Sequence, residues 1–137
     1  MFDLVIAGGT IVDGTGKPAY RGDVGVTGER VAAIGDLSQA EAKRRIDATG
    51  LTVAPGFIDI HSHSDLVYDK CPGAESKVRQ GVTTEVVGMC GFSPGPVGPG
   101  CKETVREWVG GIVGGTANSP PATWHSFGEY LDHLRGL

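Results

Sequence analysis

The sequence predicts an α/β protein in which a small β-sandwich portion, residues 1–55, precedes the first βα units of an incomplete (β/α)8 barrel, residues 56–137. Short β-rich segments separated by turns fill the first part, a pattern typical of paired strands. After residue 55 strand patterns alternate with helix patterns, which indicates parallel βα units. A closed barrel needs ~250 residues, so the second part corresponds only to the beginning of one.

Six β-rich segments are expected in the first part, each bounded by residues that favour turns. Gly8 and Gly9 are expected to stop the first segment. Turn sequences around Gly28 and Gly50 each join two segments, which predicts two hairpins. A small β-sandwich follows from this arrangement. The expected strands are residues 3–7, 10–12, 23–26, 30–34, 45–48 and 51–53.

The second part alternates strands with helices. Its first strand is nearly all apolar, which is typical of a parallel strand buried on both faces. The last helix opens with Ser126 and has Glu129 three residues later, the spacing of a capping box. The expected strands are residues 57–60 and 82–87, and the expected helices are residues 73–80, 103–113 and 126–134.

Composition and charge exclude several classes of partner. The 137-residue chain has a net charge of −4 and no basic stripe, which argues against nucleic-acid binding. No apolar stretch approaches the ~20 residues that span a bilayer, and the N-terminus does not resemble a signal peptide. We therefore expect a cytoplasmic protein without a membrane partner. Three cysteines, an odd number, do not suggest a disulfide framework. The sequence does not indicate an oligomeric state.

Two histidines, His61 and His63, follow the apolar segment 57–60 at a spacing of two residues. Alternate side chains of an extended chain project to the same face, so both imidazoles can face one site. Imidazole is the commonest metal-binding side chain, and two of them form half of a tetrahedral site. The pair also occurs by chance at solvated strand ends. Asp59 shares their face, where it either orients an imidazole or forms a salt bridge.

Cys90 closes the next strand region, as the histidines close the first. Neighbouring parallel strands lie ~4.8 Å apart, so a thiolate at one strand end can share a metal ion with imidazoles at the other. Glycines on both sides of the Met89-Cys90 pair permit a sharp turn of the backbone. The alternative interpretation of Cys90 is a small buried hydrophobic residue. The remaining candidates lack this context and are not expected at the site: Cys71, Cys101, His125 and His133.

These motifs resemble a known superfamily. Residues 54–65 (APGFIDIHSHSD), after a β-unit that begins at Asp3, resemble the start of the amidohydrolase superfamily. Residues 80–94 (QGVTTEVVGMCGFSP) and 124–131 (WHSFGEYL) are similar to its N-acyl-D-amino-acid deacylase branch, the D-aminoacylases. The resemblance covers nearly the whole chain.

The resemblance implies a zinc-dependent hydrolase of carbon–nitrogen bonds other than peptide bonds, built on a (β/α)8 barrel. It places His61, His63 and Cys90 at the metal centre, with Zn²⁺ as cofactor and a small N-acyl amino acid as substrate. Met89 departs from the branch, where asparagine commonly precedes the cysteine. The family's further metal histidines and its catalytic aspartate lie on later strands that this sequence lacks, so no catalytic residue is assigned.

We therefore expect the N-terminal portion of a D-aminoacylase-like hydrolase, inactive on its own. One alternative is another amidohydrolase, such as a dihydropyrimidinase or dihydroorotase. Such an enzyme would carry a bridging lysine on a later strand and would not need Cys90. The other alternative is a noncatalytic metal-binding or interaction module that keeps the opening elements of the fold.

Overall fold

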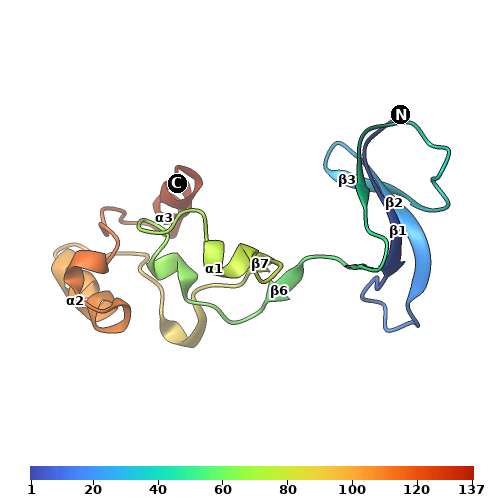
Figure 1. Cartoon of the computed structure of the whole chain (residues 1–137). Helices are drawn as coiled ribbons and strands as arrows, with labels where there is room; N and C mark the ends of the chain where they lie inside the picture. The colour runs from blue at the N-terminus through green and yellow to red at the C-terminus, as the bar shows by residue number, and fades with distance from the viewer. The chain divides into compact units, whose positions relative to one another are not determined.

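The structure, a computed structural model, describes residues 1–137 and consists of two compact units. The first unit is Met1–Pro55 and the second is Gly56–Leu137. Each unit contains its own sheet (Figure 1). The candidate metal ligands all belong to the second unit.

The first unit is a single five-stranded sheet. β1, β2 and β3 form an antiparallel meander, while β4 and β5 both run parallel to β1 along its other edge. Pairing of β2 with β3 confirms the hairpin expected around Gly28. The strands are β1 (Phe2–Ile11), β2 (Tyr20–Thr27), β3 (Arg30–Gly35), β4 (Ala42–Asp47) and β5 (Thr52–Val53).

Two expectations for this unit are wrong. The turn at Gly50 does not form a hairpin, because β4 pairs with the first half of β1 and β5 with its end, in the same direction. Gly8 and Gly9 do not stop the first strand: β1 continues through a β-bulge, where Gly8 has a φ of +71°. With β4 and β5 both along one side of β1, residues 1–55 form one sheet. That this sheet is a portion of a β-sandwich stays a prediction.

The second unit begins with a parallel strand–helix–strand crossover. β6 (Phe57–Asp59) pairs in parallel with β7 (Val82–Glu85), and α1 (Glu75–Val78) connects them. This is the predicted order, with shorter elements than expected. Asp59 lies opposite Glu85 in the register, so the two parallel strands end side by side at their C-terminal ends. Two strands establish an α/β unit but not a closed barrel.

The apolar side chains of β6 are exposed, contrary to the expectation of a strand buried on both faces. Phe57 and Ile58 are more than half exposed, and Ile60 beyond the strand is 72% exposed. The physical reason is that β7 is the only strand that pairs with β6, so its other edge and its faces meet solvent.

Two longer helices and three 3-10 turns complete the second unit. Ser126 caps the last helix as predicted, its Oγ accepting a hydrogen bond from the Glu129 N–H at 3.2 Å. The Glu129 carboxylate returns to the N–H of His125 rather than to Ser126. No helix has the length and apolar character required to cross a membrane. The elements are η1 (Ser64–Leu66), η2 (Met89–Gly91), α2 (Lys102–Val113), η3 (Thr116–Asn118) and α3 (Phe127–Arg135).

Helix α3 makes polar contacts with residues 65–69, which follow the two histidines. Tyr130 belongs to the main core cluster of this unit together with Trp124. Its hydroxyl donates a hydrogen bond to Asp65 Oδ2 at 2.8 Å, and both residues are 1% exposed. Burial raises the pKa of Asp65, while this hydrogen bond acts in the opposite direction. Further along, His133 Nε2 lies 2.9 Å from Asp69 Oδ1.

We predict that Tyr130→Phe lowers the free energy of unfolding of the second unit by about 1–3 kcal/mol, because a buried carboxyl oxygen loses its donor. Urea unfolding followed by tryptophan fluorescence measures this, since Trp108 and Trp124 both lie in this unit. Tyr20→Phe, the same change at an exposed residue of the first unit, is the control and should leave the transition unchanged. Equal transitions for wild type and Tyr130→Phe would contradict the prediction.

Candidate metal centre

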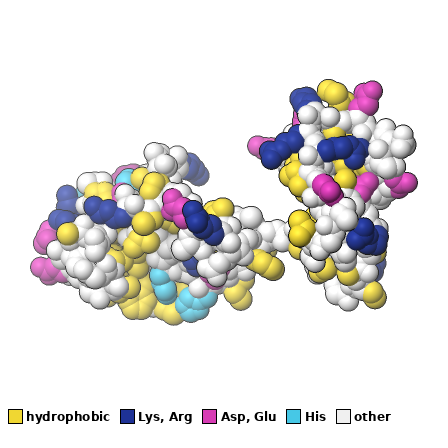
Figure 2. All heavy atoms as spheres, in the orientation of Figure 1, with side chains coloured by type: hydrophobic (Ala, Val, Ile, Leu, Met, Phe, Trp, Pro, Cys, Tyr) yellow, Lys and Arg dark blue, Asp and Glu magenta, His cyan; other side chains and the backbone are white.

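The structure brings His61, His63 and Cys90 together. Their potential ligand atoms all lie within 4.8 Å of one another. Cys90 Sγ is 3.0 Å from His61 Nε2, and the two imidazole rings have centroids 5.4 Å apart. His61 and Cys90 are exposed, whereas His63 is half-buried. Figure 2 shows histidine side chains at the surface of the second unit among hydrophobic side chains.

His61 and His63 lie in the loop after β6, and Cys90 lies in the 3-10 turn η2 beyond β7, so none of the three is at a strand end itself. β6 ends at Asp59 and β7 at Glu85. Backbone hydrogen bonds continue past these ends: the Val86 N–H donates to Asp59 O at 2.8 Å, and the Ser62 N–H donates to Val86 O at 3.1 Å. The loop that carries both histidines is therefore tied to the chain that leads to Cys90.

The backbone at Cys90 is left-handed. Cys90 has a φ of +57°, and the neighbouring Gly88 and Gly91 have φ values of +75° and +72°. The sharp turn expected from these glycines is present, and Cys90 itself takes part in it. A non-glycine residue in this conformation costs roughly 1 kcal/mol, and such strain concentrates at functional sites. Because the side chain is exposed, the interpretation of Cys90 as a buried hydrophobic residue is wrong.

The three side chains fit a zinc ion. Donor atoms that share a tetrahedral zinc lie roughly 3.3–3.7 Å apart, so a set within 4.8 Å needs only small side-chain rotations. Nitrogen and sulfur donors are those that zinc prefers. His63 Nδ1 is buried without a hydrogen-bond partner. A buried polar atom normally has a partner, and a metal ion would provide one for this nitrogen.

Asp59 contacts the histidine loop through its backbone. Its Oδ1 accepts a hydrogen bond from the His61 N–H at 3.2 Å, and its Oδ2 forms a salt bridge with Lys77 Nζ at 2.6 Å. The Lys77 ammonium, followed by the His61 N–H, lowers the pKa of Asp59. Of the two roles expected for Asp59, the salt bridge is confirmed, and the Asp59 carboxylate makes no hydrogen bond to an imidazole.

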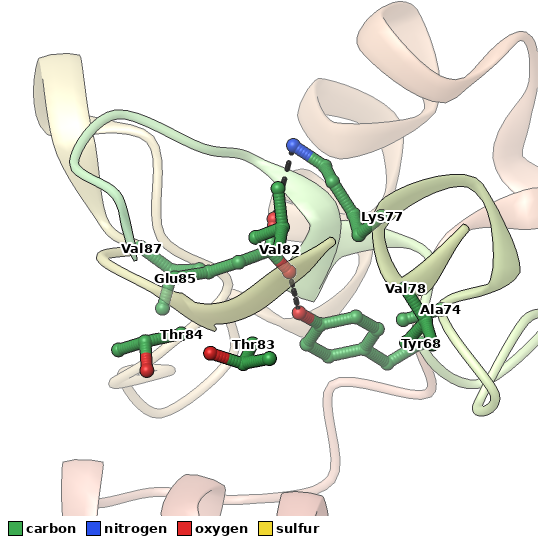
Figure 3. Close-up of a pocket in the computed structure, with 9 residues that line it drawn as sticks. All are labelled: Tyr68, Ala74, Lys77, Val78, Val82, Thr83, Thr84, Glu85 and Val87. Atoms are coloured by element: carbon green, nitrogen blue, oxygen red, sulfur yellow. Dashed lines mark hydrogen bonds and ion pairs between the residues drawn. The ribbon is translucent and has the colours of Figure 1, made fainter. Parts of the chain in front are cut away.

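Glu85 is a functional candidate that the sequence analysis missed. Its Oε1 accepts hydrogen bonds from Ser62 Oγ at 2.6 Å and Ser64 Oγ at 2.9 Å, and lies 3.0 Å from Lys77 Nζ. The Tyr68 hydroxyl donates to its Oε2 (Figure 3). Burial acts to raise the pKa of Glu85, but these donors together lower it to about 2. The available signal was a glutamate inside an otherwise uncharged strand, residues 82–87.

Of the hollows near these groups, two bear on the site. One of about 260 Å³ is lined by nine residues that include Tyr68, Lys77 and Glu85 and none of the three candidate ligands (Figure 3). A smaller one of about 100 Å³ is lined by His63, Phe92 and Ile112. The second therefore provides an apolar wall directly beside a candidate ligand.

The other histidines and cysteines lie outside the cluster, as expected. Cys71 and Cys101 are exposed and unpaired. His125 is exposed, and His133 faces Asp69. The cluster of three is the only group of its kind in the structure.

Comparison with known proteins gives strong similarity to deacylases. The N-acyl-D-glutamate deacylase of Alcaligenes xylosoxydans xylosoxydans is 60% identical over 94 residues, which are 69% of this chain and 19% of that protein. A solved D-aminoacylase, described as having a binuclear metal centre, superposes with a TM-score of 0.81 at 39% identity, covering 98% of this chain and 27% of its own.

A second solved structure is the N-acyl-D-glutamate deacylase from Bordetella bronchiseptica, complexed with zinc and a phosphonate inhibitor. It superposes with a TM-score of 0.69 at 50% identity, covering 72% of this chain and 21% of its own. This chain thus spans about a quarter or less of the length of these proteins. The sequence profile described as "Amidohydrolase family" matches residues 44–137, well over half of the chain, and the chain therefore belongs to the amidohydrolase family.

Proposed function

We propose that this chain carries part of the zinc centre of an N-acyl-D-amino-acid deacylase, which hydrolyses the linear amide bond of a small N-acyl-D-amino acid. The observation that carries the proposal is the convergence of His61, His63 and Cys90. Similarity to D-aminoacylase and N-acyl-D-glutamate deacylases supports the substrate class. In a longer protein, residues 1–55 would belong to a β-sandwich and residues 56–137 would begin the barrel.

The roles of the residues follow from their chemistry. His61 and His63 would bind zinc through neutral imidazole nitrogens, and Cys90 would bind it as a thiolate. Zinc, when bound, supplies an activated water and polarises the amide carbonyl. The apolar wall formed by Phe92 and Ile112 beside His63 would limit the access of bulk water to that ligand.

We further propose that these residues alone bind zinc without turnover. Amide hydrolysis needs a carboxylate free to carry a proton to the leaving amine. Here Asp59 and Glu85 are paired with Lys77, and Asp65 is buried against Tyr130. Each of these carboxylates is engaged in a contact that holds the structure, so the proton carrier would have to come from elsewhere in a longer protein.

The two alternatives are less well supported. A dihydropyrimidinase or dihydroorotase would have no need of a thiolate beside the histidines, whereas Cys90 Sγ lies 3.0 Å from His61 Nε2. A noncatalytic metal-binding module would share the three ligands. Transfer of the segment into an active relative separates that alternative from the proposal.

We predict that the 137-residue chain binds zinc, and that His61→Ala and Cys90→Ser each weaken binding by at least about 10-fold, because each removes one of three donors. Competition with a chromophoric zinc chelator measures the affinity. His125→Ala and Cys101→Ser remove the same groups outside the cluster and should leave it unchanged. Equal affinities for all four variants would show that zinc is not bound at this site.

We predict that a chimera, in which the matching segment of this chain replaces its counterpart in the Alcaligenes N-acyl-D-glutamate deacylase, releases D-glutamate from N-acetyl-D-glutamate. His61→Ala or Cys90→Ser in the chimera should lower this activity by about 100-fold or more, while Cys101→Ser should not. A folded, zinc-loaded but inactive chimera would favour the noncatalytic module. The 137-residue chain itself should release no D-glutamate, and zinc-dependent release that His61→Ala abolishes would overturn its proposed inactivity.

A further inference from the structure

Glu85 ends β7 yet directs its side chain towards the loop after β6. Its register partner in the sheet is Asp59, but its Oε1 reaches beyond that residue to Ser62 Oγ at 2.6 Å and to Ser64 Oγ at 2.9 Å. The Glu85 side chain is only 9% exposed. The carboxylate is therefore largely buried, and it accepts hydrogen bonds from two hydroxyls of a neighbouring loop.

The two serines alternate with the two histidines along this loop. Ser62 lies between His61 and His63 and is only 3% exposed. Its Oγ contacts both the N–H of Ser64 at 3.2 Å and the Ser64 hydroxyl at 2.9 Å. Fixing Ser62 and Ser64 therefore restricts the backbone on both sides of His63, and the direction of an imidazole depends on its backbone.

The environment of Glu85 favours a charged carboxylate at this position. Four side chains surround its two oxygens: Ser62 and Ser64 through hydroxyls, Lys77 through its ammonium and Tyr68 through its phenol. A neutral amide would offer one acceptor oxygen instead of two and would leave the ammonium without this partner. Figure 3 shows Lys77, from α1, and Tyr68, from the turn after η1, both reaching Glu85.

Glu85 makes no hydrogen bond to His61, His63 or Cys90, so its action on them would pass through the loop. We infer that Glu85 is a positioning residue for the metal centre: through Ser62 and Ser64 its carboxylate fixes the loop that presents His61 and His63. This inference rests on the proposed metal site. Partners that orient metal ligands commonly change metal affinity by 10–100-fold when they are removed.

The test is a cobalt(II) titration of the 137-residue chain, read by visible absorption, which reports both affinity and ligand geometry. Glu85→Gln and Ser62→Ala should each weaken cobalt binding by about 10-fold or more and alter the spectrum of the bound ion. Tyr68→Phe is the matched control. It removes the donor to Glu85 Oε2 but leaves the hydrogen bonds of Ser62 and Ser64 to Oε1, so its spectrum and affinity should equal those of the wild type.

Circular dichroism of each apo variant shows whether it is folded, and Ser62→Ala, the smaller change, decides the matter if Glu85→Gln is unfolded. Wild-type affinity and spectrum in folded Ser62→Ala and Glu85→Gln would overturn this inference alone. Equal losses in Tyr68→Phe and Ser62→Ala would also overturn it, because they would show a general structural role. Absence of cobalt binding by the wild-type chain would overturn the proposed metal site as well.

Discussion

The parallel pairing of β6 with β7 is the constraint on which the candidate site depends. Asp59 lies opposite Glu85, so the loops after the two strands begin next to each other at the C-terminal ends of the sheet. Hydrogen bonds of Val86 with Asp59 and Ser62 extend this alignment into the loops. A shift of the register would move Cys90 away from the histidines, because the histidines follow the end of β6 and Cys90 follows the end of β7.

Two polar contacts hold the chain at the histidines and directly after them. The Glu85 carboxylate, with Lys77, holds the serines of the histidine loop. Asp65, the residue after Ser64, is buried against Tyr130 of α3. The most strained residue of the cluster is Cys90, with its left-handed backbone. The site thus combines histidines on a hydrogen-bonded loop with a cysteine in a left-handed turn that the flanking glycines permit.

The sequence predicted the structure best where residues of a distinctive chemical type occur at a spacing that a known local structure requires. The two histidines and Cys90 could be assigned to one site because parallel strands align their ends, and the cap at Ser126 could be predicted from local spacing. The hairpin at Gly50 could not be excluded, because the pairing of β4 and β5 with β1 is a long-range choice. Glu85 was missed because its partners come from three separate segments of the chain.

The most direct test of the account is zinc K-edge X-ray absorption spectroscopy of the zinc-loaded 137-residue chain. If His61, His63 and Cys90 bind the ion together, the spectrum contains one sulfur scatterer at about 2.3 Å and nitrogen scatterers at about 2.0–2.1 Å. The sulfur contribution should disappear in Cys90→Ser and persist in Cys101→Ser. A first coordination sphere of nitrogen and oxygen alone in the wild-type chain would contradict the account.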